Sequence, residues 1–354
     1  MTASEKEQFQ NILVIRLDKV GDLLLSTPFL RNLRECYPHS HIAVLVKPYT
    51  REVLLGNPHV DEIIVHHHGD SLIRALMAAS PLRSRPWDMA VALSPTVISY
   101  VTAMLSGARE RAGYTYSRRI AARLIAAATL TSYRVLAIDE ALAGGEAIPH
   151  EVRQTFTILE EMGWNPGDYP LEVYPGREAG DYAAGLIGKS APGKKLIGIH
   201  LSWKWLTPPW TAHDMLTFIR KVAADYKEYG VLVTYGPEEE HVAEEMERDF
   251  LNEGNVFFAG GLAFRQWAAL IGRCSIFFST DTGSLHCAAA MGVPTVCLYE
   301  KRTFTHCSQQ WAPWKIPAVI IEKDDPSGTI ERLIEGCKKL LKETVSHETR
   351  RGEI

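Results

Sequence analysis

Short apolar runs alternate with longer amphipathic stretches along the first hundred residues. Residues 12–17 form an apolar run interrupted only by Arg16, which is typical of a strand buried on both faces of a sheet. Residues 23–35 have the spacing of a helix, with Pro28 in its first turns, where proline is tolerated. The same pattern predicts strands at residues 42–46, 62–65 and 89–93, and helices at residues 49–55, 71–79 and 96–105.

Two more helices are predicted, at residues 116–128 and 151–162, before the chain becomes polar. Residues 165–176 are rich in Pro, Gly and Asp, which indicates a linker. The second half then repeats the alternation. Its predicted strands are residues 196–199, 231–235, 256–258, 275–278 and 295–299, and its predicted helices are residues 211–226, 238–250, 264–272, 284–291 and 327–343. The polar residues after 346 are expected to be disordered.

Alternation of strands and helices implies parallel sheets joined by right-handed crossovers. Two such halves around one linker predict an α/β fold with two Rossmann-like domains. We place an N-terminal domain at residues 1–168, a C-terminal domain at residues 169–326, and a last helix with a tail at residues 327–354, the helix packing back toward the first domain. In such sheets ligands bind beyond the carboxyl ends of the strands, so the loops at those ends are the candidates for function.

Composition and charge exclude several classes of protein. The chain has 354 residues, of which 46% are hydrophobic and 23% charged, with a net charge of −4. That length suits two domains, and the near-neutral charge argues against nucleic-acid binding, which needs a basic surface. No apolar run is long enough for a transmembrane helix, and the polar start lacks the apolar stretch of a signal peptide. We therefore expect a cytoplasmic protein that binds no nucleic acid.

The cysteines and a run of histidines are the residues that would point to a metal. The six cysteines include no C-x-x-C pair, and most lie in apolar surroundings, so we interpret them as buried, reduced thiols. A metal cluster built from the four cysteines between residues 274 and 307 is the alternative. The histidines at 66–68 are interpreted as a solvated loop, because three consecutive histidines cannot all face one metal.

Two carboxylates lie in the loop that follows the first predicted strand. Gly21 permits a tight turn there, and Asp22 would sit at the N-terminus of the following helix. A carboxylate in that position can act as a general base toward a hydroxyl within hydrogen-bond reach. It can equally cap the helix, and the local sequence alone favours the cap. Asp18 is a second candidate base, with an ordinary surface loop as its alternative interpretation.

A cluster of small polar residues, 279–284, follows another apolar strand and opens an alanine-rich helix. The free N–H groups of that first turn and the helix dipole would attract an anion. Gly283 allows close approach to the backbone, Thr282 and Ser284 add hydroxyl donors, and His286 on the first turn lies within reach of the same anion. We predict a phosphate or diphosphate site at this helix N-terminus.

The alternative is an ordinary helix with Asp281 as its N-cap, although the small residues exceed what a cap requires. The loop matches neither the Walker pattern nor the G-x-G-x-x-G dinucleotide fingerprint. No Asp-x-Asp pair appears that would carry a divalent metal with the diphosphate. The predicted site therefore has no metal and no cofactor.

Several short motifs follow one another in a specific order. The first is RLDKVGDLLLSTP at residues 16–28, and the last comprises Asp281-Thr282-Gly283, His286, residues 288–290, Gly292 and Pro294. Between them lie Asn57-Pro58 with Val60-Asp61, Trp87-Asp88, residues 107–111 with Gly113-Tyr114, and His150. In order and spacing these motifs resemble the signatures of glycosyltransferase family 9, the ADP-heptose:lipopolysaccharide heptosyltransferases, over residues 11–342.

The resemblance implies a GT-B fold, with two Rossmann-like domains facing a central cleft. The N-terminal half would bind the acceptor and the C-terminal half the nucleotide sugar, and transfer would invert the anomeric centre without a metal. The family's general base matches Asp22. The implied donor-binding residues are Lys204, Glu239, Asp281, Thr282, Gly283 and His286, and the implied acceptor-binding residues are Asp18, Arg118, Arg119 and His150.

The donor loops depart from the family pattern. A Pro-Gly turn usual after one strand is replaced by the run at residues 200–202, His-Leu-Ser. The lysine that usually binds the diphosphate, two residues before a tryptophan, aligns with Pro208, so Lys204 is the nearest cation. A glycine common after a later strand is Glu300 here. These departures affect the identity of the donor more than the fold.

The function implied by the resemblance is transfer of a heptose from ADP-heptose to a lipid-linked oligosaccharide acceptor of the lipopolysaccharide inner core. The implied location is the cytoplasm, with peripheral contact at the inner face of the bacterial inner membrane. One alternative is a family 9 relative with another sugar donor or another acceptor, such as a protein. A non-catalytic GT-B protein that binds a sugar nucleotide and a nucleotide-sugar 2-epimerase are the others.

Overall fold

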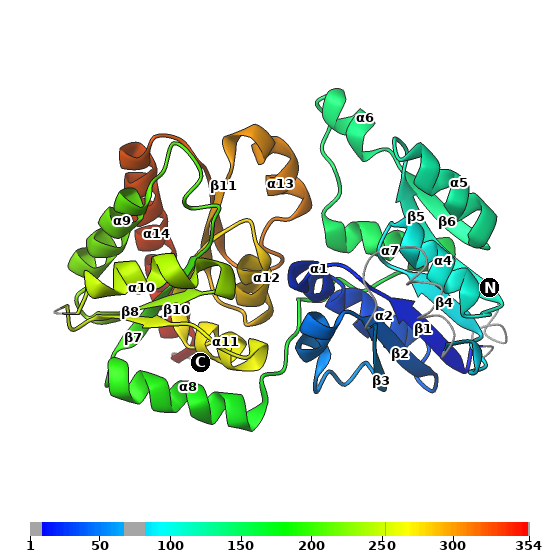
Figure 1. Ribbon diagram of the computed structural model, residues 1–354, viewed down its shortest axis with the longest axis horizontal. Coiled ribbons are helices and arrows are strands. Elements are labelled where there is room, and N and C mark those ends of the chain that lie inside the picture. The colour runs from blue at the N-terminus through cyan, green and yellow to red at the C-terminus, as the bar shows by residue number, and fades with distance from the viewer. Residues whose placement is uncertain (1–8, 67–81, 252, 353–354) are drawn as a thin grey trace. The chain divides into compact units, whose positions relative to one another are not determined.

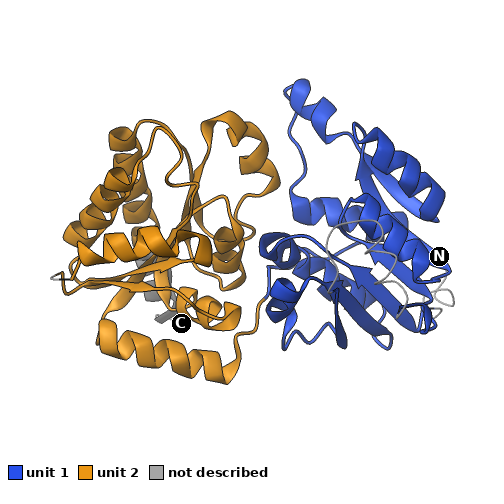
Figure 2. Ribbon diagram, viewed as in Figure 1, with its two compact units in different colours: residues 1–172 blue, residues 173–354 orange. Residues whose placement is uncertain are grey.

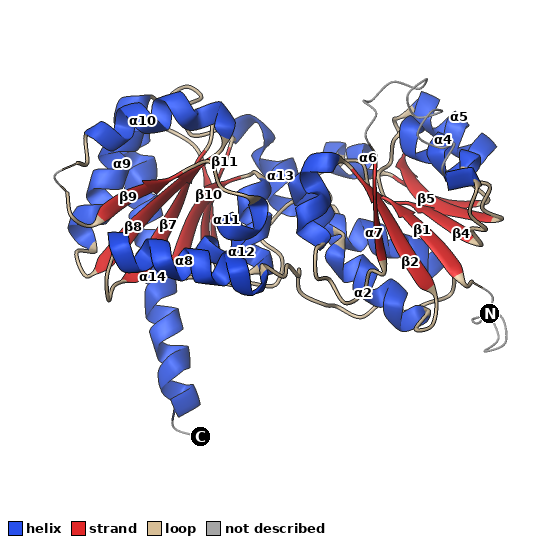
Figure 3. Cartoon of the chain, turned by 60° about the horizontal axis from the view of Figure 1, so that its bottom comes forward, coloured by secondary structure: helices blue, strands red, loops and turns tan. Residues whose placement is uncertain are grey.

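The computed structural model describes residues 9–66, 82–251 and 253–352, with side chains described as far as residue 343. The chain divides into two compact units, Met1–Glu172 (unit 1) and Val173–Ile354 (unit 2), as Figure 2 shows. Each unit contains one six-stranded parallel sheet with helices on both faces (Figures 1 and 3). The predicted helix at residues 71–79 and the histidines at 67 and 68 lie outside the described residues.

The sheet of unit 1 has the strand order β3-β2-β1-β4-β5-β6. All neighbouring strands run parallel, so their carboxyl ends share one edge. The order reverses between β1 and β4, and the loops that follow these two strands diverge there, which is where open sheets of this kind bind ligands. The strands are β1 (Asn11–Ile15), β2 (His41–Val46), β3 (Glu62–Val65), β4 (Met89–Ala92), β5 (Glu110–Tyr116) and β6 (Ser132–Leu136).

Two layers of helices cover the sheet of unit 1. Helices α4 and α5 pack together on one face, and α2 and α7 pack together on the other (Figure 3). The described helices are α1 (Val20–Leu25), α2 (Thr27–Cys36), η1 (Pro48–Leu54), α4 (Val97–Leu105), α5 (Ile120–Thr129), α6 (Ile138–Ala143) and α7 (Glu151–Glu161). The turn η1 is a 3₁₀ helix where the sequence predicted an ordinary one.

The single helix predicted at residues 23–35 is wrong, because α1 and α2 are separate helices that meet at Ser26. Pro28 has no N–H to donate to the carbonyl of Leu24. The Thr27 hydroxyl donates to that carbonyl instead, at 2.8 Å. The Ser26 hydroxyl likewise donates to Asp22 O at 2.8 Å. This break turns the chain directly after α1, the helix that contains Asp22.

The polar stretch predicted as a linker is held on α2 for most of its length. Asn32 exchanges two hydrogen bonds with the backbone of Gly167, at 2.9 and 2.6 Å. Arg31 pairs with Glu172 at 2.9 Å, and the Glu172 N–H donates to the Thr27 hydroxyl at 2.9 Å. The chain therefore belongs to unit 1 as far as Glu172, four residues beyond the boundary expected from the sequence.

The sheet of unit 2 has the strand order β12-β11-β10-β7-β8-β9, again with all neighbours parallel. Its strands are β7 (Lys195–Leu201), β8 (Tyr229–Tyr235), β9 (Val256–Ala259), β10 (Cys274–Thr280), β11 (Thr295–Tyr299) and β12 (Ala318–Glu322). Its helices are α8 (Gly176–Ser190), α9 (Ala212–Asp225), η2 (Pro237–Glu239), α10 (Glu240–Arg248), α11 (Phe264–Ile271), α12 (Gly283–Ala290), η3 (Lys301–Thr303), α13 (Phe304–Gln310) and α14 (Pro326–Gly352).

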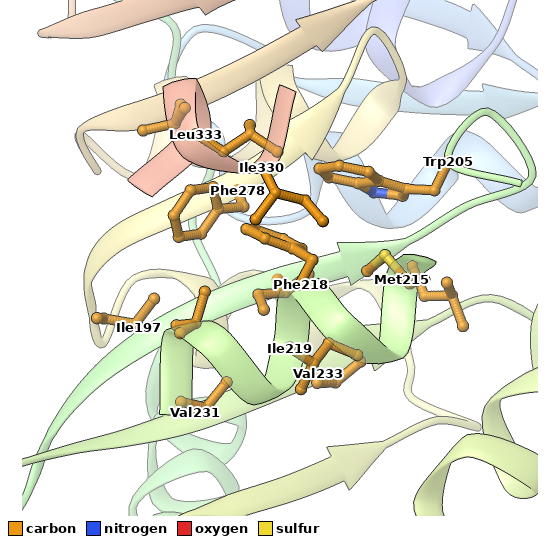
Figure 4. Close-up of a cluster of buried hydrophobic side chains, with 14 of the residues drawn as sticks. Ile197, Trp205, Met215, Phe218, Ile219, Val231, Val233, Phe278, Ile330 and Leu333 are labelled. Atoms are coloured by element: carbon orange, nitrogen blue, oxygen red, sulfur yellow. The ribbon is translucent and has the colours of Figure 1, made fainter. Parts of the chain in front are cut away.

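An aromatic core anchors the loop that follows β7. The Trp205 ring stacks on Phe218 with centroids 5.4 Å apart, and Phe218 meets Phe278 edge-on at 5.1 Å (Figure 4). Trp205 and Trp210 are both buried, and the Trp205 indole N–H donates to His200 O at 2.8 Å. Residues 202–210, called the Lys204 loop below, are therefore held at two points by the core.

Helix α14 packs on the unit 2 sheet. It contacts β12, β11 and β10, together with α9. The helix extends to Gly352, past residue 346, where the sequence predicted disorder. Its expected packing toward the first domain stays a prediction.

Candidate functional site

A buried arginine organises the carboxyl edge of the unit 1 sheet. Arg16 lies one residue beyond β1 with its side chain 1% exposed. One terminal nitrogen, Nη1, donates to Leu93 O in the loop after β4. The other, Nη2, donates to Glu151 Oε1 at 3.1 Å, and the Tyr114 hydroxyl donates to the same oxygen at 3.0 Å. The first strand is thus tied to the loop after β4 and to the first turn of α7.

Both candidate carboxylates of the first loop lie against this arginine. Arg16 Nε is 3.3 Å from Asp18 Oδ2, and Arg16 Nη2 is 3.8 Å from Asp22 Oδ1. The other oxygen of Asp22 accepts from the Lys19 N–H at 3.1 Å, so Asp22 also caps α1 from its third position. We call Arg16, Asp18, Asp22, Tyr114 and Glu151 the Arg16 cluster.

The Asp22 carboxyl has the properties of a proton acceptor. Its side chain is 31% exposed, so a hydroxyl of a bound molecule can reach it. Burial of the rest of the group raises the pKa of Asp22 above its usual value, and the positive charge of Arg16 opposes this rise. A carboxylate with a raised pKa accepts a proton more readily than an ordinary aspartate.

The other residues predicted for the acceptor side differ in how they are held. His150 is the N-cap of α7, and its Nδ1 accepts from the Val152 N–H at 3.2 Å. Arg118 is exposed and lies 3.8 Å from Glu140. Arg119 stacks over the Tyr116 ring at 4.7 Å and donates to Pro95 O at 3.3 Å, in the loop after β4. Binding of an acceptor by these residues stays a prediction.

In unit 2, Lys204 and Asp281 meet at the carboxyl edge of the sheet. Lys204 Nζ donates to Asp281 Oδ2 at 2.9 Å and also to the Asp281 carbonyl. Asp281 directly follows β10, and its side chain is mostly buried. Lys204 is partly exposed, so its ammonium is held beside the start of α12 and stays accessible.

A buried lysine fixes the backbone of the Lys204 loop. Lys323, which follows β12, is 2% exposed. Its Nζ donates to Lys204 O at 2.6 Å and to Thr207 O at 2.8 Å. Glu300 Oε1 accepts from Lys323 Nζ at 3.0 Å and from the Thr207 hydroxyl at 2.6 Å. Burial lowers the pKa of Lys323, and the carboxylate of Glu300 opposes the shift.

The start of α12 combines free helix amides with a hydroxyl network. Thr282, rather than Asp281, is the N-cap residue. Ser284 Oγ lies 2.7 Å from the hydroxyls of both Thr282 and Ser279. The first amides of an α-helix have no partner inside the helix, so they are available to an anion. His286, one turn in, is buried.

Glu239 joins the end of β8 to the Lys204 loop. Its carboxylate is almost fully buried and accepts from the Trp203 N–H at 3.1 Å. The Trp203 indole donates to Glu238 O at 3.2 Å. Burial raises the pKa of Glu239. The predicted donor residues Lys204, Glu239, Asp281, Thr282 and Gly283 thus all lie at or just beyond the carboxyl ends of β7, β8 and β10.

The model of glycosyltransferase family 9 (heptosyltransferase) matches residues 76–332, more than half of the chain. The chain belongs to this family. It is therefore a glycosyltransferase, as the sequence motifs predicted. The matched range includes the Lys204 loop and α12, whereas Asp22 lies before its first residue.

The family 9 chain is similar to heptosyltransferases along most of its length. It is 22% identical to lipopolysaccharide heptosyltransferase 3 of Escherichia coli over 305 residues, which is 83% of each chain. A glycosyl transferase family 9 structure from Veillonella parvula matches with a TM-score of 0.79 and 21% identity, over 94% of this chain and 98% of that one. The E. coli ADP-heptose lps heptosyltransferase II matches with a TM-score of 0.74 and 20% identity, over 94% and 99%. These structures confirm the predicted GT-B fold of two Rossmann-like domains.

Two residues that the sequence resemblance gave as departures from the family pattern, Lys204 and Glu300, are linked in the structure. Glu300, where a glycine is common, accepts the hydrogen bonds of Lys323 and Thr207. Lys204, which lies outside the usual lysine position, has its backbone carbonyl held by the same Lys323. Lys323 therefore binds both Glu300 and the backbone of the Lys204 loop.

Sequence reasoning missed three residues that hold these sites. Arg16 was visible as the one charge within an apolar run, and Glu151 as the acid at the start of a helix. Lys323 gave a weaker signal, because the strand that precedes it was not predicted. In the part of the chain that the structure describes, no group of three or more His, Cys, Asp or Glu side chains could hold a metal ion. Among the same residues, no helix is long and apolar enough to cross a membrane.

Proposed function

We propose that this family 9 enzyme transfers a heptose from ADP-heptose to an inner-core acceptor of lipopolysaccharide, with inversion at the anomeric carbon and without a metal. The observation that carries the proposal is the Asp22 carboxylate, which is partly exposed and lies between the Lys19 amide and Arg16. The name of E. coli ADP-heptose lps heptosyltransferase II supports the choice of donor. The same name and that of lipopolysaccharide heptosyltransferase 3 support the choice of acceptor.

The proposed reaction is a single displacement. Asp22 accepts the proton of an acceptor hydroxyl, whose oxygen attacks the anomeric carbon of the donor sugar from the face opposite the diphosphate. The new carbon–oxygen bond forms as the bond from that carbon to the diphosphate oxygen breaks, and ADP leaves with the electron pair.

The leaving diphosphate needs positive charge and hydrogen-bond donors. Lys204 supplies the charge in this proposal, and the first amides of α12 supply the donors. Asp281 holds the Lys204 ammonium, with Lys204 Nζ 2.9 Å from Asp281 Oδ2. The loop that carries Glu239 resembles the family's ribose-binding loop, and in this proposal the Glu239 carboxylate binds a ribose hydroxyl.

The proposed acceptor carries phosphates and carboxylates on a lipid anchor. Planar guanidinium groups bind such anions through paired hydrogen bonds, which suits the exposed Arg118 and Arg119. A lipid-linked acceptor would bring the enzyme to the membrane surface on the cytoplasmic side. The contact would be peripheral.

The test is a transfer assay with the purified full chain, ADP-heptose and a deacylated Kdo-bearing inner-core acceptor. We expect ADP release and a product heavier by one heptose, with inverted anomeric configuration and unchanged turnover in EDTA. A thermal-shift screen of nucleoside diphosphates and nucleotide sugars runs beside it, since ligands of the native state raise its melting temperature. Turnover of another nucleotide sugar in place of ADP-heptose would contradict the proposed donor. Binding of a nucleotide sugar without turnover would contradict the proposal that the protein catalyses transfer.

A further inference from the structure

Helix α5 of unit 1 exposes an apolar face. Ile120 is 68% exposed and Leu124 is 67% exposed, one helical turn apart. The exposed positions around them include Ala121, Ala127 and Ala128. Arg123 carries the one charge in the sequence of α5, IAARLIAAAT. The outward side of a surface helix is normally polar, so this face is built to be covered.

The two elements beside α5 also carry exposed apolar side chains. Met104 on α4, which packs against α5, is exposed. On the edge strand β6, Tyr133 packs into the core beneath α4 and α5, and Val135, two residues later on the same side of the strand, is exposed. Met104, Ile120, Leu124 and Val135 are called the α5 face.

Three arginines border the α5 face at the start of the helix. Arg119 and Arg123 donate to the carbonyl oxygens of Pro95 and Ser117, at 3.3 and 2.9 Å, and Arg123 also interacts electrostatically with Glu140. Arg118 has a carboxylate nearby, Glu140 at 3.8 Å. Exposed apolar side chains bordered by arginines are complementary to a lipid surface with anionic headgroups.

We propose that the α5 face docks on an anionic lipid surface, with α5 lying along it. Ile120 and Leu124 would enter the boundary between headgroups and acyl chains, and Arg119 and Arg123 would contact the headgroup phosphates. A second copy of the chain fits less well, because in a two-fold contact this face meets itself and the partner's α5, which has no acidic residue, offers the arginines no carboxylate.

The position of α5 would place a docked lipid surface near the Arg16 cluster. The helix follows β5, so its N-terminus lies at the carboxyl edge of the unit 1 sheet, the edge that carries the Arg16 cluster. An acceptor held in the same lipid surface would present its headgroup at that edge. This link to the acceptor rests on the proposed function, whereas the lipid contact itself does not.

The test is co-sedimentation of the full chain with vesicles of phosphatidylglycerol and phosphatidylethanolamine, and with vesicles of phosphatidylcholine alone. We expect binding to the anionic vesicles, lowered about ten-fold or more in the double variant Ile120→Ser/Leu124→Ser. Arg123→Gln should lower it about five-fold. The matched control is Leu251→Ser, because Leu251 lies in unit 2 and is 75% exposed.

Several outcomes would overturn the proposal. These are no binding to anionic vesicles, an equal loss in the Leu251→Ser control, or concentration-dependent dimerisation that the double variant abolishes. Transfer to the deacylated acceptor in the absence of vesicles should be unchanged in the double variant. Failure of vesicle binding therefore contradicts the α5 face, and failure of transfer by the parent chain contradicts the proposed function.

Discussion

Arg16 and Glu151 are 135 positions apart in the sequence, and Arg16 Nη2 donates to Glu151 Oε1 at 3.1 Å in the interior of unit 1. The same carboxylate oxygen accepts from the Tyr114 hydroxyl at 3.0 Å. A buried arginine requires such a partner, because an uncompensated buried charge is costly. The pair therefore determines where the guanidinium lies, and with it the surroundings of Asp18 and Asp22.

Replacing Glu151 by Ala should destabilise the protein strongly. The substitution removes the carboxylate nearest the buried Arg16 and leaves Asp18 and Asp22 as its remaining partners, so the cost should be about 3 kcal/mol, the lower end for a broken buried pair. Urea unfolding would measure the loss. Glu161→Ala is the matched control, because Glu161 forms an exposed pair with Arg134 at 2.8 Å and should change stability by less than about 1 kcal/mol. Equal effects of the two substitutions would contradict the importance of the buried pair.

Asp22→Asn should lower kcat by roughly 10²–10⁴-fold, the scale of a positioned base. Asn keeps the size of the side chain and a carbonyl oxygen for the Lys19 N–H, so the fold should persist. Nucleotide-sugar affinity, measured by calorimetry, should change little, because the proposed donor residues lie in unit 2. If Asp22 only capped α1, Asn would be nearly silent, since it caps about as well as Asp. Near-normal turnover would then direct attention to Asp18.

The pH profile of kcat/KM should show the raised pKa of Asp22. A general base must be deprotonated, so activity falls as the pH drops through that pKa. Burial raises this pKa above the usual value of 3.8, and the acidic limb should therefore lie at a higher pH than an ordinary aspartate would give. The measurement is kcat/KM from pH 4 to pH 8. An acidic limb that persists unchanged in the residual activity of Asp22→Asn would assign it to another group.

Lys323→Met should lower kcat/KM for the nucleotide sugar by roughly ten-fold through loss of buried hydrogen bonds to the Lys204 loop. If Lys323 acts by positioning Lys204, the double variant Lys204→Met/Lys323→Met should be no worse than Lys204→Met alone. Lys221→Met is the control, because Lys221 is a half-exposed lysine on α9 that pairs with Asp225 at 3.1 Å. Additive effects in the double variant would refute the positioning role.

His200 should make the unfolding free energy depend on pH. Burial lowers its pKa from 6.5 to about 4. Between these values the unfolded chain binds a proton that the folded chain does not, so the contribution is complete above pH 6.5 and is lost as the pH falls toward 4. The loss is roughly 2 kcal/mol once partial exposure is allowed for. His200→Gln should flatten this dependence, and substitution of the exposed His241 should leave it intact.

Much of the fold was predictable from periodicity. Strongly apolar strands such as β1 and β11 and amphipathic helices such as α9 carry clear patterns. The strand β5, with sequence ERAGYTY, was missed because charged residues and a glycine interrupt its alternation. β12 was missed, and with it the position of Lys323. Helix α8 was not predicted, because its glycine-rich sequence resembles that of a linker.

Only the parts of the candidate site that lie within local sequence motifs were predictable. The segments that contain Asp22 and Asp281 are recognisable because each follows an apolar strand and lies at the start of a helix. Their partners are distant in sequence. Nothing near Asp22 indicates that Arg16 is held by Glu151, and nothing near Lys204 indicates that Lys323 binds its carbonyl. Such pairs depend on strand order, which the sequence pattern does not specify.

The bond from Lys323 to the Lys204 carbonyl spans 119 positions of the chain. During translation Lys204 is synthesised long before Lys323. Strand β7 is likewise synthesised before β10, which is its neighbour in the sheet. During synthesis the Lys204 loop therefore stays without its buried lysine until the last strand of unit 2 has emerged. The proposed donor-binding edge is completed only after Lys323 has been made, so a chain that lacks Lys323 cannot hold Lys204 in its final place.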